Sequence, residues 1–161
     1  MPDQPVERQP TSCTAAGLRW GLRRAGAPGA PRLLLIHGTG SSGASWAAVA
    51  ERLAGQFDML LPDLPGHGGT HGFADRHASL PRMAEALAGL LGHLGWAPDL
   101  IAGHSAGAAV MLQLALTGRV PQARGLLSLN GALQPLPGLL GAVAPTVARL
   151  ASRSHWLPTW V

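Results

Sequence analysis

One five-residue segment has the residue types of a catalytic nucleophile. Residues 103–107 read Gly-His-Ser-Ala-Gly and fit the pattern G-x-S-x-G. The segment lies between an apolar run, Asp99–Ala102, and an apolar stretch of helical character, Ala108–Leu116. Two glycines permit a turn so tight that Ser105 is strained and projects its hydroxyl from the carboxyl edge of a sheet. These flanks favour a nucleophile for acyl transfer over a serine that only caps a helix.

A second loop has the composition of an oxyanion site. His37-Gly38-Thr39-Gly40 follows the first buried strand and could aim a backbone N–H at a substrate oxyanion. The two predicted donors are the backbone N–H groups of Thr39 and Ala106. The residues predicted to support the two loops are His37, Gly38, Gly40, Gly103, His104 and Gly107. A plain glycine-rich turn and a phosphate-binding loop are the alternatives, and the lack of a following Lys excludes a Walker-type loop.

Other polar residues are assigned to structure rather than chemistry. The segment 63–68, Asp-Leu-Pro-Gly-His-Gly, has His67 and His71 close by and could suggest a catalytic acid or a metal site. A structured turn is the favoured interpretation, and no metal site or cofactor is predicted. The remaining candidate bases, His93, His104 and His155, are expected to be structural or solvent-facing.

Residues with a carboxylate side chain occur only in the first 99 positions of the chain. Asp99 is the last of them, and no Asp or Glu occurs between Ala106 and Val161. In hydrolases with this serine pattern the acid and then the histidine follow the nucleophile along the chain. Since a serine without a base is a weak nucleophile at neutral pH, we expect negligible hydrolysis by this chain alone.

Strand-like and helix-like segments alternate around these loops. The expected strands are Gly17–Arg24, at an edge, followed by Arg32–His37, Phe57–Leu61, Asp99–Ala102 and Gly125–Leu129. The expected helices are one capped by Ser45 and ending at Leu53, one capped by Ser79 with Pro81 in its first turn, and Ala108–Leu116. This order predicts an α/β fold with a mostly parallel sheet, right-handed crossovers and flanking helices.

Three regions are expected along the chain. Residues 1–16 form a polar leader, residues 17–131 a core, and residues 132–161 the start of a cap or lid with one helix, Thr146–Ser152. The uncharged stretch Gly125–Ala148 contains three prolines and polar residues, so it is not expected to span a membrane.

Composition excludes several classes of protein. Hydrophobic residues make up 47% and charged residues 12% of the 161 positions, which indicates a globular protein. The twelve basic residues are all arginines and are scattered, so nucleic-acid binding is not expected. A single cysteine, Cys13, allows neither an internal disulfide nor a cysteine zinc cluster. With no signal-peptide pattern at the N-terminus, the expected location is the cytoplasm.

Residues 33–131 resemble the α/β-hydrolase superfamily through His37-Gly38 and the segments 63–68 and 103–107. The chain is also similar to the magnesium chelatase accessory proteins of bacteriochlorophyll synthesis, through residues 17–20, 37–40, 103–109 and 128–133. That resemblance implies a role beside magnesium insertion into protoporphyrin, with the chelatase complex as partner. Members of that family are longer at the C-terminus, so the chain is expected to be a fragment that stops inside the cap and leaves one sheet edge open.

Three functions remain open. The first is an accessory protein of pigment synthesis built on a hydrolase scaffold. The second is a general serine esterase or thioesterase that acts on a small acyl substrate. The third is a non-catalytic module whose apolar cap, Leu133–Leu150, covers a tetrapyrrole or contacts a membrane surface.

Overall fold

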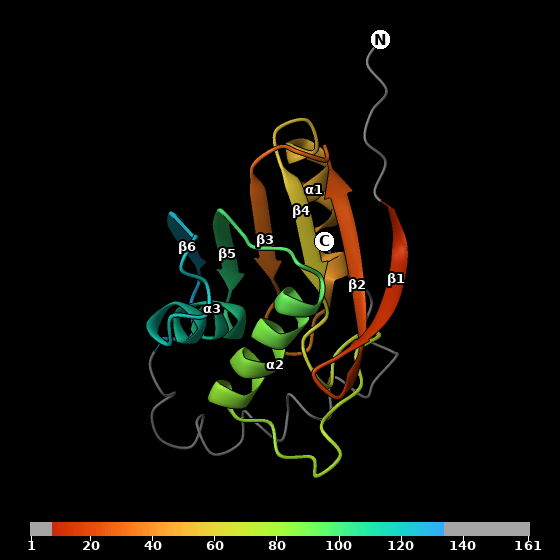
Figure 1. The fold of residues 1–161 in the computed structure, drawn as a ribbon, viewed down its shortest axis with the longest axis vertical. Helices are drawn as coiled ribbons and strands as arrows, with labels where there is room; N and C mark the ends of the chain where they lie inside the picture. Colours follow the sequence, from red (N-terminus) through yellow and green to blue (C-terminus); the bar gives the residue numbers. More distant parts are fainter. Residues whose placement is uncertain (1–7, 134–161) are drawn as a thin grey trace.

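A computed structural model describes residues 8–133, which form one mixed sheet with helices on both faces (Figure 1). The sheet order is β1-β2-β4-β3-β5-β6. Its strands are β1 (Arg8–Ala15), β2 (Leu18–Gly26), β3 (Arg32–Ile36), β4 (Asp58–Pro62), β5 (Leu100–His104) and β6 (Gly125–Leu129). The helices are η1 (Gly43–Trp46), α1 (Ala47–Leu53), α2 (Leu80–His93) and α3 (Ala106–Leu116). Strands β4, β3, β5 and β6 run parallel, whereas β1 and β2 pair antiparallel, which confirms the expected α/β class.

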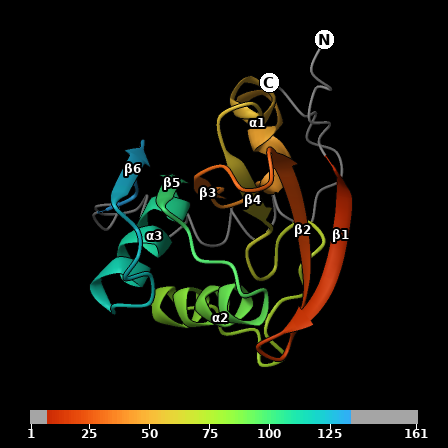
Figure 2. The same cartoon turned by 45° about the horizontal axis from the view of Figure 1, so that its top comes forward.

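The helices divide between the two faces of the sheet. Helix α1 covers one face, and α2 and α3 cover the other (Figures 1 and 2). Along β3, Leu34 and Ile36 pack in the cluster that contains α2 and α3, and Leu33 and Leu35 pack in the cluster that contains α1. All four side chains are buried, which explains why this strand is an unbroken apolar run.

The first strand corrects two sequence expectations. Residues 8–15 were expected to belong to a polar leader, but they form β1 and pair antiparallel with β2. Strand β2 is therefore not an edge strand, since β1 lies on one side of it and β4 on the other. The reason is that β1 is itself an edge strand with exposed polar residues, Thr11, Ser12 and Thr14, and so has no apolar run to reveal it.

Helix starts differ from the expected capping pattern. Ser45 does not cap α1, because it lies inside the 3₁₀ helix η1 and its hydroxyl donates to the carbonyl of Ser42 at 2.8 Å. Ser79 occupies the N-cap of α2 as expected, although its side chain makes no capping hydrogen bond. Helix α3 begins at Ala106, two residues before the expected start and directly after Ser105.

The predicted cap, residues 132–161, lies mostly outside the described residues, and so do the predicted helix Thr146–Ser152 and His155. Between residues 8 and 133, none of the helices has the length and hydropathy needed to cross a bilayer.

Candidate active site

Ser105 is the single residue between β5 and α3, and its backbone is strained. Its φ is 52° and its ψ is −119°, a conformation that side-chain-bearing residues rarely adopt. The serine is half-buried, at the carboxyl end of β5. The tight turn that the G-x-S-x-G pattern predicts is therefore present, at the expected residue.

Both glycines of the pattern are required by close packing. A Cβ on Gly103 would lie 2.6 Å from the Cα and N atoms of Ala108. A Cβ on Gly107 would collide with the backbone carbonyl oxygens of Ile36 and His37. Glycine at these positions lets the first turn of α3 approach β5 on one side and the end of β3 on the other.

The backbone of Ser105 is also held by the segment at the end of β6. Its N–H donates to the carbonyl of Leu129 at 3.0 Å. Its carbonyl accepts from the N–H of Ala108 at 3.1 Å and from the N–H of Ala132 at 3.0 Å. The bend is thus fixed by both the helix that follows it and the neighbouring strand.

The glycine-rich loop after β3 lies directly beside Ser105. A Cβ added to Gly38 would be 3.0 Å from the Cβ of Ser105 and 3.2 Å from Nδ1 of His104. Gly38 is buried, whereas Thr39 and Gly40 are exposed, and Gly40 has a φ of 76°. The two loops that the sequence singled out, 37–40 and 103–107, therefore meet at the carboxyl edge of β3 and β5. The roles of Thr39 and Ala106 as oxyanion donors stay predictions.

His37 is a buried residue that holds the glycine-rich loop in place. Its side chain is fully buried, its Nδ1 is 2.7 Å from the carbonyl of Gly38, and its Nε2 accepts from the N–H of Leu64 at 2.9 Å. Because Nε2 must accept, the proton lies on Nδ1, which donates to Gly38. Burial lowers the pKa of His37 to about 4, so the ring is neutral at pH 7.

Asp63 holds the other end of the same loop. Its Oδ1 accepts from the N–H of Gly43 at 2.6 Å, and its Oδ2 accepts from the N–H of Gly69 at 2.7 Å. Thr70 adds a hydroxyl bond to the Asp63 carbonyl at 2.7 Å. The segment 63–68 is therefore a structured turn, as the sequence predicts, and residues 63 and 64 together hold both ends of the segment 37–43.

The sequence did not reveal this arrangement. The sequence predicts only a supporting role for His37, because the partner of its Nε2 is 27 residues away along the chain. The one available signal was the Asp-x-x-Gly spacing of residues 63–66, which is typical of a turn but does not identify what the carboxylate binds.

The other histidines are not placed as bases for Ser105. His67 lies with its ring centroid 5.3 Å from that of His37, and its Nδ1 is 3.2 Å from the carbonyl of Pro65. His71, His93 and His104 are exposed. In the described part of the chain, no imidazole or carboxylate is hydrogen-bonded to the Ser105 hydroxyl, and no group of three His, Cys, Asp or Glu could hold a metal ion.

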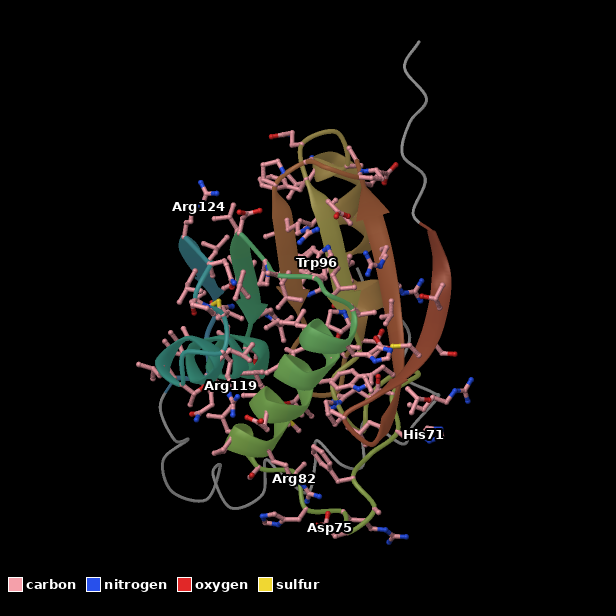
Figure 3. The ribbon with its side chains drawn as sticks, viewed as in Figure 1. His71, Asp75, Arg82, Trp96, Arg119 and Arg124 are labelled. Atoms are coloured by element: carbon pink, nitrogen blue, oxygen red, sulfur yellow. The ribbon has the colours of Figure 1, made fainter. Side chains whose placement is uncertain are left out.

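Asp99 lies at the wrong end of β5 to act on Ser105. Its carboxylate accepts from the backbone N–H of Arg32 at 2.9 Å and from the Arg124 guanidinium at 3.3 Å. Arg124 marks this edge in Figure 3, at the amino ends of β5 and β6. The length of β5 separates Asp99 from Ser105, roughly 15–20 Å at about 3.3 Å per residue.

The loop before α2 contains an exposed salt bridge. Arg82 donates to both carboxylate oxygens of Asp75, at 2.7 and 2.6 Å, and its guanidinium lies 4.1 Å from the ring centroid of Phe73 (Figure 3). The backbone N–H of His77 and the Arg82 guanidinium lower the pKa of Asp75. The ion pair thus connects Asp75 in the loop to Arg82 in the first turn of α2.

The sequence pattern of the family described as "Alpha/beta hydrolase family" matches residues 33–161. The chain belongs to the alpha/beta hydrolase family. It is 41% identical over 130 residues to the magnesium-chelatase 30 kDa subunit of Rhodobacter capsulatus, an alignment that covers 81% of this chain and 45% of that protein. It is also 40% identical over 91 residues to the pimeloyl-[acyl-carrier protein] methyl ester esterase of Aeromonas salmonicida, covering 54% of this chain and 33% of the esterase.

Solved structures agree with this family assignment. The N-acyl homoserine lactonase AidH, crystallised with N-butanoyl homoserine, has a TM-score of 0.69 and 30% identity, covering 80% of this chain and 46% of the lactonase. This alpha/beta hydrolase chain therefore spans less than half the length of each of these three relatives.

Proposed function

We propose that this chain carries the nucleophile half of a serine acyl-transfer site, with Ser105 as the nucleophile. The observation that carries the proposal is the strained backbone of Ser105, φ 52° and ψ −119°, between β5 and α3. Strain of this kind persists where surrounding packing enforces it, and here Gly103 and Gly107 permit that packing. The strained turn holds the side chain at the carboxyl edge of the sheet, where a substrate could reach its hydroxyl.

The neighbouring loop supports the second part of the chemistry. Attack by the Ser105 hydroxyl on an ester or thioester carbonyl would place negative charge on the carbonyl oxygen. In our proposal the backbone N–H groups of Thr39 and Ala106 donate to that oxygen. Ala106 is the first residue of α3, so its N–H has no partner within the helix and lies at the positive end of the helix dipole.

The proposal also includes a limit on activity. The hydroxyl proton of Ser105 must pass to a base, and neutral His37 cannot serve, since both its ring nitrogens are engaged with backbone groups. We therefore expect negligible ester hydrolysis by this chain alone. A fluorophosphonate probe should label Ser105 far more slowly than it labels a full-length relative, and rapid labelling that survives in Ser105→Ala would overturn the assignment of the nucleophile.

The biological role we propose is as an accessory to magnesium chelatase in bacteriochlorophyll synthesis, in the cytoplasm. The support is the 41% identity to the Rhodobacter capsulatus 30 kDa subunit, which extends over 81% of this chain. Deleting the gene should lower bacteriochlorophyll yield. Restoring the gene with Ser105→Ala should separate the two forms of the proposal: recovered yield indicates a scaffold, and no recovery indicates that the serine acts chemically. Unchanged yield after deletion would contradict the role.

A general esterase or thioesterase is the second candidate, favoured by the 40% identity to the Aeromonas salmonicida methyl ester esterase. Its test is turnover of short acyl esters by the longest natural form of the protein. Turnover that Ser105→Ala abolishes, with no pigment defect on deletion, would favour this candidate over the first.

The third proposal is that the apolar cap, Leu133–Leu150, binds a tetrapyrrole or a membrane surface. Nearly all of that segment lies outside the described residues. Porphyrin titration and liposome flotation would test it.

A further inference from the structure

A cleft of about 690 Å³ opens at the amino ends of β3 and β5, the edge of the sheet opposite Ser105. The segment before β3 contributes residues 29–31, and the segment that leads into β5 contributes Ala97 and Leu100. These side chains are small or apolar. The volume lies within the range of pockets that hold small molecules, roughly 300–1,000 Å³. The cleft therefore has the size and the walls of a small-molecule site, and it lies apart from the candidate nucleophile.

Two arginines, Arg32 and Arg124, line the same cleft and bring positive charge to it. The Arg32 guanidinium carbon lies 5.8 Å from the ring centroid of Trp96, within the range of a cation–π interaction. Trp96 is held in turn by a hydrogen bond from its indole N–H to Asp58 at 3.2 Å. Within residues 8–133, no carboxylate lies within ion-pair distance of the Arg32 guanidinium. This half-buried charge therefore has an aromatic neighbour but no anionic partner in the described part of the chain.

Arg124 is only loosely engaged by its acidic neighbour. One guanidinium nitrogen of Arg124 lies 3.3 Å from Oδ1 of Asp99, and the Arg124 side chain is 82% exposed. The other oxygen of Asp99 accepts from the backbone N–H of Arg32 at 2.9 Å, so this carboxylate is shared between two donors. Exposed ion pairs contribute little to stability, so the Arg124 guanidinium can turn toward a ligand at small cost.

A smaller cleft of about 270 Å³ adjoins the first, since Ala97 and Gln122 line both. It lies between the end of α2 and the segment after α3, and Leu91, Trp96 and Val120 are among its lining residues. These three side chains are buried, and their outer surfaces give the smaller cleft an apolar floor. Together the two clefts join a cationic end to an apolar end.

We propose that the two clefts bind an organic monocarboxylate with an apolar tail. The carboxylate lies between the guanidinium groups of Arg32 and Arg124, because arginine binds carboxylates through paired N–H donors. The tail lies in the smaller cleft. A single negative charge fits this site better than the double charge of phosphate, since Asp99 and Asp58 already offset much of the local positive charge. The site is independent of the chemistry proposed for Ser105, from which the length of β5 separates it.

Octanoate is the probe, and its binding to the 161-residue chain is measured by equilibrium dialysis. The expected result is saturable binding with a Kd of about 1 mM or below. Octanol has the tail without the charge, and acetate has the charge without the tail. Each should bind at least about fivefold more weakly than octanoate. In backbone-amide NMR spectra, octanoate should shift the signals of Ala97, Leu100 and Gln122 most.

Variants assign the binding to the two clefts. Arg32→Gln and Arg124→Gln should each weaken octanoate binding at least about fivefold, with circular dichroism unchanged. Arg82→Gln is the matched control, because it removes the same charge from an exposed ion pair far from Arg124 (Figure 3), and it should bind octanoate normally. Ala97→Leu places a larger side chain where the two clefts adjoin and should also weaken binding.

Several results would overturn the proposal: no saturable binding, equal binding of octanol and octanoate, or octanoate binding that both Arg32→Gln and Arg124→Gln retain. Inorganic phosphate that binds as tightly as octanoate would also overturn it, because the tail would then contribute nothing. Amide shifts confined to β6, whose leucines are exposed, would indicate adsorption to an apolar edge instead of the clefts. Ser105→Ala should bind octanoate as the unchanged chain does, so failure of this proposal leaves the proposed function untouched.

Discussion

At Ser105 the protein accepts a backbone conformation that glycine would adopt with less strain. Ser105→Gly should therefore raise the free energy of unfolding by about 1 kcal/mol, because relief of a strained φ, roughly 1–3 kcal/mol, exceeds the entropy cost of glycine, roughly 0.5–1 kcal/mol. Ser105→Ala keeps the strain and is the control. Urea denaturation of the two variants measures the difference, and equal midpoints would argue against strain at this residue.

Substitution by alanine should change the free energy of unfolding in opposite directions at Gly107 and at Gly92. Gly107→Ala drives a methyl group into the carbonyl oxygens of Ile36 and His37 and should destabilise the fold by about 3 kcal/mol or prevent folding. Gly92 lies in α2 with nothing within 4 Å of an added Cβ, so Gly92→Ala should stabilise by about 0.5–1 kcal/mol. Thermal denaturation of both variants provides the comparison, and a tolerated Gly107→Ala would contradict the tight packing under the turn.

His37 should make stability depend on pH. Burial lowers its pKa from 6.5 to about 4, so between these values the unfolded chain binds a proton that the folded chain does not. The contribution of neutral His37 is complete above pH 6.5 and declines as the pH falls toward 4, by about 3 kcal/mol in total. Denaturant midpoints at pH 7.5 and 4.5 measure it. His37→Gln should flatten this dependence, whereas a substitution of exposed His93 should not.

At the scale of elements, Asp63 joins three segments: the start of η1, the loop at Gly69 and, through Thr70, strand β2. An asparagine can accept through only one side-chain atom, so Asp63→Asn should leave one of the two glycine N–H groups unpaired and cost about 1–3 kcal/mol. Hydrogen exchange should accelerate at Gly43 or Gly69. Asp75→Asn, at an exposed carboxylate, should leave exchange at those two amides unchanged.

The elements also show what a sequence can reveal. Strands β3, β4 and β5 are apolar runs because both their faces are covered, and that pattern predicts them to within a residue or two. Strand β1 has one covered face and polar side chains, so its sequence pattern is that of a polar leader. The turn at Ser105 was predictable because its glycines are local in sequence. The bond from Leu64 to His37 was not, since it depends on how β3 and β4 are placed relative to each other.

At the scale of the whole molecule, the leucines of β6 should promote self-association when no other chain covers them. Sedimentation velocity at increasing protein concentration should show a rising weight-average sedimentation coefficient, because exposed apolar strand edges pair with one another. Leu127→Arg should suppress the rise. A monodisperse, cooperatively unfolding monomer at all concentrations would contradict the expectation, based on the sequence, of an open sheet edge.

The hydrogen bonds between Ser105 and the segment 129–132 couple the conformation of the serine to the strand β6. The amide that donates to Leu129 belongs to the strained residue itself, so fraying of β6 removes one of the constraints on the dihedral angles of the serine. Reactivity at position 105 would then vary with the local order of a strand that contributes no side chain to the chemistry. The deuterium uptake of a single amide, that of Ser105, would report whether the outer strand is in place.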